Sequence, residues 1–321
     1  MLSQKQLING LRRNLFLVAG MLSAAIFWLA PGQQIFAQAV SPVTTINEEA
    51  AKAEITIESV RGNLSVLMGS GGNITVLTGT DGKLMVDGGI ALSRVRIQAA
   101  LDSISSAPLK YLINTHWHWD HTDSNAWLHG QGAIIIAQEN TLKRLSVATR
   151  VEDWKFTFQP PPAGALPTVT FKTNKTIKFD GETIVMKNYG IGHTDTDIWV
   201  YFKKADVMAT GDIWWNGYYP FIDNSTGGGI NAIIRWANLT LAQVTDKTII
   251  IPGHGPVGNR AQFVEFRDML VNIRDKVARL KKQGKSIEEV VAAKPTAAYD
   301  AKWGGFVIDP AFFTRLVYAG L

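Results

Sequence analysis

The stretch THWHWDH at positions 115–121 contains four potential metal ligands within six residues. His116 and His118 alternate with tryptophans at the end of the strand-like run LKYLIN, and alternate residues of a strand face the same side. A turn after them would bring Asp120 and His121 beside the two imidazoles. Imidazole nitrogens and a carboxylate oxygen suit a borderline cation such as Zn²⁺. The spacing favours two neighbouring metals over one.

Three further candidate ligands each follow a strand-like run and are flanked by glycine. They are His193 in GIGHTDTD, Asp212 at the end of VMATGD and His254 in TIIIPGHG. Glycine lets the backbone come close to a site, and functional residues concentrate on such loops. A single histidine is more often structural, but five of the six histidines follow strands here, which indicates a metal site. His129, at the end of NAWLH, is left unassigned.

The motifs THWHWDH, GHTDTD, TGD and PGHGPVG, in this order, resemble the metallo-β-lactamase superfamily over residues 54–321. The resemblance implies a first metal on His116, His118 and His193, and a second on Asp120, His121 and His254, with Asp212 bridging them. It implies two Zn²⁺ as cofactors, with Mn or Fe as the alternatives. It also places Asp87, in the turn VDGG, as a support for the ligands rather than a ligand.

The resemblance further implies a hydrolase in which a metal-bound hydroxide attacks a carbonyl and Asp120 orients that hydroxide. Two β-lactamase subclasses of the superfamily have a cysteine at the bridging position, whereas this chain has Asp212 and no cysteine. Asp212 thus looks like the glyoxalase II, lactonase and phosphodiesterase pattern and argues against a β-lactamase. Together with the aromatic residues near the motifs, it favours an ester, thioester or lactone of a partly apolar small molecule as the substrate. The alternatives are amide hydrolysis of β-lactams, phosphodiester hydrolysis, iron-dependent oxygenation and a metal-binding module without catalysis.

Aromatic residues surround the candidate ligands. Those expected to form walls of a substrate pocket are Trp119, Trp214, Trp215, Tyr218 and Tyr219. On a strand, Trp117 would face away from the histidines beside it and is expected in the core. Several lactonases of the superfamily have a tyrosine where Trp215 stands, so that positioning hydroxyl is missing here. Lysine and arginine are scarce near the motifs, which argues against a highly charged phosphoester.

The sequence around these residues contains both strand-like and helical runs, which must position the candidate ligands. Short strand-like runs fill residues 54–89 and are separated by Gly and Asn turns, among them GSGGN, which we interpret as a plain hairpin turn. Helical and strand-like runs then alternate, and a Pro-rich loop or flap spans residues 159–167. A second set of strands leads to helices, one of which is expected between Asn259 and Gly284. We therefore expect an α/β protein, an αββα sandwich of two mixed sheets face to face with helices outside.

The N-terminal residues differ in kind from the rest. Basic side chains precede an apolar run, and AQA before Val40 offers a cleavage site, so residues 1–39 are expected to be a signal peptide. An uncleaved membrane anchor is the alternative. Residues 40–53 are expected to be a polar linker, and residues 54–321 a single hydrolase domain.

Charge and cysteine content bear on location and partners. Cleaving the leader would remove three basic and no acidic side chains, which lowers the formal net charge from +5 to +2. We therefore expect a small-molecule substrate, no nucleic-acid partner, and no stable membrane insertion once the leader is cleaved. Export to the bacterial periplasm or the medium is expected. Because the chain has no cysteine, its core and bound metal must supply the stability that disulfides give other exported proteins.

Overall fold

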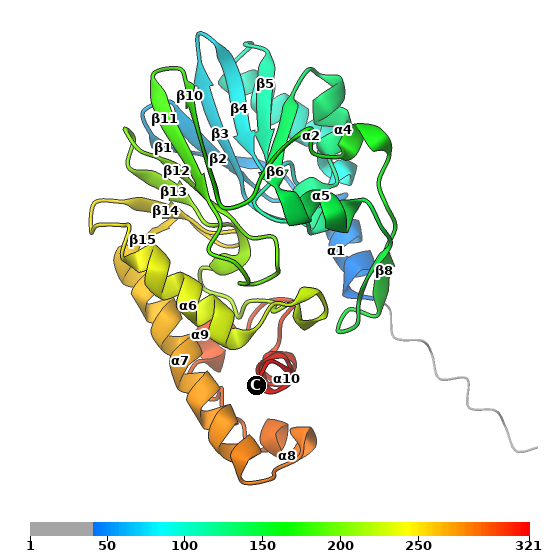
Figure 1. The fold of residues 1–321 in the computed structure, drawn as a ribbon, viewed down its shortest axis with the longest axis vertical. Helices are drawn as coiled ribbons and strands as arrows, with labels where there is room; N and C mark the ends of the chain where they lie inside the picture. Colours follow the sequence, from blue (N-terminus) through cyan, green and yellow to red (C-terminus); the bar gives the residue numbers. More distant parts are fainter. Residues whose placement is uncertain (1–40) are drawn as a thin grey trace, which may run out of the picture. The chain divides into compact units, whose positions relative to one another are not determined.

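Two mixed β-sheets form the interior of the computed structural model, which describes residues 41–321 (Figure 1). The predicted signal peptide, residues 1–39, lies outside the described residues. The first sheet has seven strands in the order β1 (Thr56–Arg61), β2 (Leu64–Met68), β3 (Ile74–Gly79), β4 (Gly82–Val86), β5 (Leu109–Ile113), β6 (Ile134–Gln138) and β9 (Val169–Phe171). The second has six, in the order β10 (Asn174–Phe179), β11 (Glu182–Lys187), β12 (Trp199–Phe202), β13 (Val207–Ala209), β14 (Ile249–Ile251) and β15 (Gly258–Asn259).

Each sheet combines an antiparallel meander with a parallel part. Strands β1 to β4 are antiparallel neighbours, whereas β4, β5, β6 and β9 are parallel. In the second sheet β10 to β13 are antiparallel and β13 pairs with β14 in parallel. Parallel neighbours end at the same edge of a sheet, so the loops that follow β13 and β14 begin side by side. A separate hairpin consists of β7 (Thr149–Val151) and β8 (Phe156–Phe158).

Apolar side chains fill three layers of the sandwich. A central cluster contains inward-facing residues of both sheets, such as Leu84 and Val200, so the sheets pack face to face. The outer face of the first sheet packs on α2 (Arg94–Ile104) and α4 (Asn125–Gly130). The outer side of the second packs on the helices α6 (Ile230–Leu241), α7 (Arg260–Lys282) and α10 (Pro310–Ala319). The shorter helices are α3 (Trp119–Thr122), α5 (Glu139–Leu145), α8 (Ile287–Ala292) and α9 (Asp300–Trp303). The αββα sandwich expected from the sequence is confirmed.

The segment 40–53 contains a helix where the sequence predicts a polar linker. Helix α1 (Pro42–Ala50) begins after Ser41, whose hydroxyl accepts a hydrogen bond from Val43 N. Val43 and Ala50 are buried on one side of the helix, which lies beside β8 (Figure 1). The segment is mostly polar, but these two buried side chains form a narrow apolar stripe that packs on the domain.

Helix α7 agrees closely with its predicted limits. Asn259 accepts a hydrogen bond from Gln262 N, and the Gln262 side chain accepts one from Asn259 N, which forms a capping box. The chain leaves the helix at Gly284, which has φ +78°. The Pro-rich residues 159–167 form a loop with one 3₁₀ turn, Ala163–Ala165.

A turn of the first sheet is bonded to a loop of the second. Asn73, which ends the GSGGN turn between β2 and β3, donates its backbone N–H to Gly253 O at 2.7 Å. Its side-chain amide donates to Pro252 O at 3.0 Å and to Gly255 O at 2.8 Å. This turn is therefore more than a hairpin connection, because it fixes the PGHG loop relative to the first sheet.

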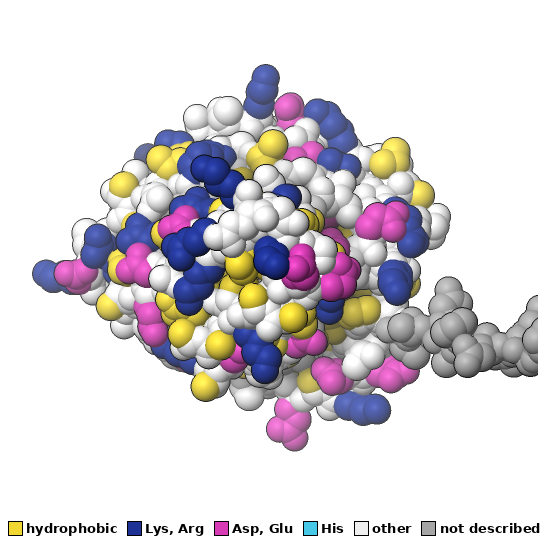
Figure 2. All heavy atoms as spheres, turned by 90° about the horizontal axis from the view of Figure 1, so that it is seen from below, with side chains coloured by type: hydrophobic (Ala, Val, Ile, Leu, Met, Phe, Trp, Pro, Cys, Tyr) yellow, Lys and Arg dark blue, Asp and Glu magenta, His cyan; other side chains and the backbone are white. Residues whose placement is uncertain are grey.

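Within residues 41–321 no helix combines the length and apolar character needed to cross a bilayer. The face seen in Figure 2 carries dark blue Lys and Arg side chains interspersed with magenta Asp and Glu. That face therefore presents no continuous patch of one sign of charge.

Candidate metal centre

Seven buried histidines and aspartates meet where strands of both sheets end. His116 and His118 follow β5, and the other five come from α3, the loop after β11 and the loops after β13 and β14. They form two groups, within each of which one ligand atom per residue lies within 4.8 Å of the others: His116, His118, His193 and Asp212, and Asp120, His121 and His254. None is more than 7% exposed. The structure thus brings together all seven residues that the sequence predicts as ligands.

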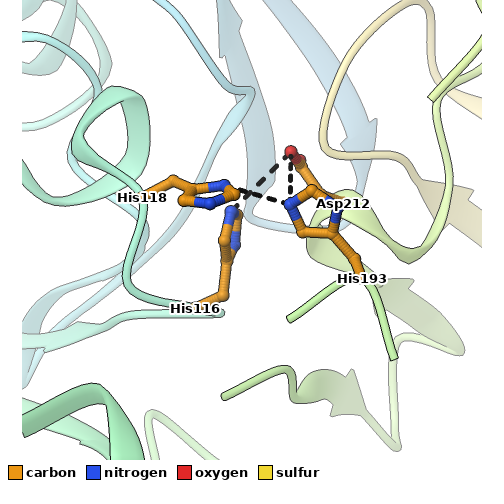
Figure 3. A group of neighbouring side chains, drawn as sticks. All are labelled: His116, His118, His193 and Asp212. Carbon is orange, nitrogen blue, oxygen red and sulfur yellow. Dashed lines mark hydrogen bonds and ion pairs between the residues drawn. The ribbon is translucent and has the colours of Figure 1, made fainter. Parts of the chain in front are cut away.

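Figure 3 shows the first group converging on one point. His118 Nδ1 lies 3.0 Å from His193 Nε2. Asp212 Oδ2 lies 3.7 Å from His116 Nε2 and 3.6 Å from His193 Nε2. Three imidazole nitrogens and one carboxylate oxygen therefore surround a common centre, as in a four-coordinate zinc site.

The second group lies on the other side of Asp212. Asp212 Oδ1 is 3.1 Å from His121 Nε2 and 3.5 Å from His254 Nε2. Asp120 Oδ2 is 3.2 Å from His254 Nε2. The two oxygens of Asp212 thus face different groups, which suits a carboxylate that bridges two metals.

Hydrogen bonds indicate which ring nitrogens of His118 and His193 carry the proton. His118 donates Nε2–H to Asp223 Oδ2 at 3.0 Å, and His193 donates Nδ1–H to Phe221 O at 2.9 Å. Each ring therefore presents a lone pair at its other nitrogen, and these two lone pairs face each other. Such a contact is unfavourable unless a cation lies beside both nitrogens, so the geometry fits a metal.

Asp87 orients one histidine of each group. Its Oδ2 accepts a hydrogen bond from His121 Nδ1 at 2.8 Å and another from Thr115 Oγ1 at 2.7 Å. Because the Thr115 hydroxyl donates to Asp87, it accepts from His116 Nδ1 at 3.0 Å. Both rings are thereby turned with Nε2 toward Asp212. Asp87 thus has the supporting position expected from the sequence.

Several polar atoms of the site have no hydrogen-bond partner among the described residues although they are fully buried. They are His116 Nε2, His121 Nε2, His254 Nε2 and Asp212 Oδ1. His121 Nε2 lies near Asp212 but not at an angle that makes a hydrogen bond. A buried polar atom without a partner costs about 1–3 kcal/mol. Four in one place fit a metal site, because the donor set of imidazole and carboxylate suits a cation such as Zn²⁺.

The two groups differ in their protonation. Burial lowers the pKa of His116 well below its usual value and lowers the pKa of His193 to about 4. Burial acts in the same direction on His121 and His254, but nearby carboxylates, Asp212 foremost, outweigh it. They raise the pKa of His254 to about 9 and that of His121 well above its usual value. His116 and His193 are therefore ready to bind a cation, whereas a cation at His121 and His254 must displace protons.

Glycines allow the backbone to pack directly on the ligands. A Cβ at Gly72 would lie 2.1 Å from the His121 ring, and a Cβ at Gly253 would lie 2.0 Å from Asp212 Oδ1. A Cβ at Gly71 would lie 2.6 Å from Asp120 O. No side chain fits at these three positions without moving a ligand.

A cavity of about 220 Å³ opens onto Asp120 and His254. Of the residues predicted as pocket walls, Trp215 lines it. Trp119 lines a second cavity, on the side of α1 that faces β8. Trp214 and Tyr219 are fully buried in the core against Phe263 and Phe313, and Tyr218 packs on Phe306 outside the cavity lining. The cavity at the ligands is therefore not lined by the other four residues predicted as its walls, which are Trp119, Trp214, Tyr218 and Tyr219.

The reason for the difference between the two neighbouring tryptophans is local. Trp215 pairs with His254 in a parallel bridge, and their rings lie 4.2 Å apart. Trp214 precedes it in an extended conformation and so points the opposite way, into the core. Trp117 is buried as expected, and His129, near the end of α4, donates Nδ1–H to Ala133 O in the segment that follows the helix.

Asp223, Thr115 and Trp154 are site residues that sequence reasoning missed. Asp223 also accepts bonds from the Thr226 hydroxyl and from two backbone N–H groups, so its carboxylate is held in place for His118. Trp154 stacks on the His118 ring at 6.1 Å and lines the cavity. Only Thr115, which precedes the histidine motif, had a signal in the sequence.

The chain was compared with known families and curated proteins. A family model described as the metallo-beta-lactamase superfamily matches residues 67–258. The chain is 28% identical over 160 residues to a metallo-beta-lactamase type 2 of Bacillus sp. (strain 170), covering 50% of this chain and 56% of that protein. It is 26% identical over 159 residues to a hydroxyacylglutathione hydrolase of Polaromonas sp. (strain JS666), covering 49% and 52%. The chain therefore spans about half the length of these curated relatives.

Solved structures of low sequence identity share the fold. The sec-alkylsulfatase Pisa1 from Pseudomonas sp. matches with a TM-score of 0.63 and 15% identity, covering 85% of this chain and 51% of that chain. The DIM-1 metallo-beta-lactamase matches with a TM-score of 0.54 and 21% identity, covering 68% and 98%. At these identities the likeness concerns the fold alone.

Titration of the metal-free protein with Zn²⁺ near pH 7.5 should release protons from the second group. We expect about one from His254, whose pKa of about 9 lies above that pH, and a further release from His121, whose pKa nearby carboxylates raise well above its usual value. Calorimetry in buffers of different ionisation enthalpy measures this release. The contribution of His254 should fade above its pKa of about 9 and be missing in His254→Ala. A binding heat that is the same in every buffer would contradict the assignment.

Replacing the two supporting aspartates should have different effects. Asp87→Asn should weaken metal binding at both groups by about 10- to 100-fold, because Asp87 orients His121 and, through Thr115, His116. Asp223→Asn should weaken only the first group. Stepwise competition with a chromophoric chelator resolves the two affinities, and circular dichroism checks the fold. If both variants weakened metal binding equally at both groups, Asp87 and Asp223 would not have these separate roles.

Proposed function

The chain belongs to the metallo-β-lactamase superfamily, and we propose that it is a metal-dependent hydrolase that holds two Zn²⁺ and cleaves an ester, thioester or lactone. The observation that carries the proposal is the position of Asp212 between two groups of buried ring nitrogens. A complete set of seven ligands supports hydrolysis over single-iron oxygen chemistry, which would leave some of them without a role. Bound there, Zn²⁺ would supply a water of lowered pKa and would polarise a carbonyl oxygen.

Asp120 is the residue of this chain that we assign to catalysis. Its carboxylate belongs to the second group and also lines the cavity, so it can contact both a ligand and a substrate. The charges of His121 and His254 outweigh the effect of burial and lower the pKa of Asp120. Asp120 is therefore ionised at neutral pH in the metal-free protein. In the loaded protein the charge of the metal would replace the displaced protons of His121 and His254, so Asp120 would still be able to orient the attacking water by accepting its hydrogen bond.

The cavity supports a partly apolar substrate. Its lining is mainly aliphatic and aromatic, with Trp154, Trp215 and Phe306 among the larger side chains. No lysine or arginine of the described part of the chain lines it, so those residues would offer a phosphodiester no cation besides the metals. This supports a carbonyl compound of low charge over phosphodiesters, nucleic acid and membrane lipid headgroups.

His116→Ala should abolish hydrolysis and lower the metal content, because it removes one nitrogen of the first group. We expect turnover to fall by at least about 10³-fold, measured with chromogenic esters, thioesters and lactones on zinc-loaded protein. His129→Ala is the matched control, because His129 lies outside both groups. Metal-free protein that turns over substrate as fast as zinc-loaded protein would contradict the proposal. If the protein preferred β-lactams, phosphodiesters or alkyl sulfates, it would still be a hydrolase, but the proposed substrate class would be wrong.

We also propose that the hydrolase is exported. The support is the basic and apolar composition of residues 1–39 and the AQA that precedes Val40. N-terminal sequencing of protein recovered from a bacterial periplasm should begin at Val40. A chain that keeps its first 39 residues there would show that the segment is an anchor instead.

A further inference from the structure

The cavity at the second group has two walls of different character. One wall contains the proposed ligands Asp120 and His254. The other consists of the C-terminal half of α1, with Ile46 and Ala50, and of aromatic side chains from distant loops. A substrate whose carbonyl lies at the ligands must therefore place its remaining part against α1.

Among residues 41–321, Glu49 brings the only formal charge to the α1 wall. Asp120, at the ligands, is the other charged lining residue apart from His254, and no lysine or arginine is present in the lining. Glu49 is exposed on the last turn of α1 and has no ion-pair partner among the described residues. Its neighbours Glu48 and Lys52 do not line the cavity. A negative group on the substrate would therefore meet an uncompensated carboxylate.

The carbonyl end of α1 contributes little charge to this wall. Ser93 Oγ and Arg96 Nη2 both donate to Ala50 O at 2.7 Å, so the partial negative charge of that carbonyl is compensated. Arg96 is not among the lining residues, so Glu49 remains the charged side chain that a substrate meets at this wall.

The size of the cavity limits what enters it. An apolar cavity of roughly 150 Å³ holds one benzene ring, and this one measures about 220 Å³. It accommodates one ring or a short alkyl chain. Larger parts of a substrate would remain outside, past Glu49.

We infer that the cavity selects an apolar acyl or alkyl group that is neutral or positively charged, and that Glu49 rejects substrates whose distal end is anionic. This inference rests on the proposed function, because it assumes that the carbonyl lies at the ligands. Glu49 acts on specificity and not on the chemical step.

The test compares three hydroxamic acids on the zinc-loaded protein, with the same short alkyl chain ending in methyl, trimethylammonium or carboxylate. The hydroxamate anchors each compound at the metals, and calorimetry measures Kd without any turnover. We expect the carboxylate to bind about tenfold more weakly than the methyl compound, and the trimethylammonium at least as tightly. In Glu49→Gln the difference should shrink to about twofold, and in Glu49→Lys the order of the charged compounds should reverse.

Glu48→Gln is the matched control, because it removes the same charge from the adjacent position outside the cavity. It should leave the order unchanged. The same order and ratios in Glu49→Gln as in the unchanged protein would overturn the inference, as would failure of all three compounds to bind at millimolar concentration. If the charge order holds but no ester, thioester or lactone is cleaved, the proposed carbonyl hydrolysis fails alone. If esters are cleaved without regard to distal charge, the inference about Glu49 fails alone.

Discussion

The structure of this site depends on Asp212, a buried carboxylate whose two oxygens face two sets of imidazoles. Burying a carboxylate without a partner is unfavourable. Burying two neutral imidazole rings whose lone pairs face each other is unfavourable as well. The positive charge of His254 and His121 compensates Asp212 in the second group. In the first group the facing lone pairs of His118 and His193 need a cation between them. The rest of the fold thus holds the first group in positions that suit a bound cation, and the second in positions where a cation could replace two protons.

Asp87 and Asn73 show how the two sheets are coupled to that centre. Asp87, directly after β4, fixes the orientation of His121 and, through Thr115, of His116. Asn73, from the turn before β3, bonds to the loop that carries His254. Residues of the first sheet thus set the position of ligands that follow strands of both sheets. These hydrogen bonds make the centre rigid. Glycine backbone also packs directly on His121 and Asp212, which restricts the movement of these two side chains further.

The fold and the seven candidate ligands could be predicted because their signals are local. Period-two strands, turn glycines and the spacing of THWHWDH lie within short stretches of chain. What could not be predicted depends on residues far apart: Asp223 meets His118 across 105 positions, and α1 meets the cavity only after folding. Trp214 and Trp215 illustrate the same limit. Neighbouring residues face opposite ways, but only the bridge to His254 shows which one faces the site.

We propose that Asp212 bridges two metals. Anomalous diffraction at the zinc edge from crystals of the zinc-loaded protein would locate them. We expect two peaks, one among His116, His118 and His193 and the other among Asp120, His121 and His254, with Asp212 in contact with both. A single peak, or two peaks of which only one contacts Asp212, would show that Asp212 is not a bridge.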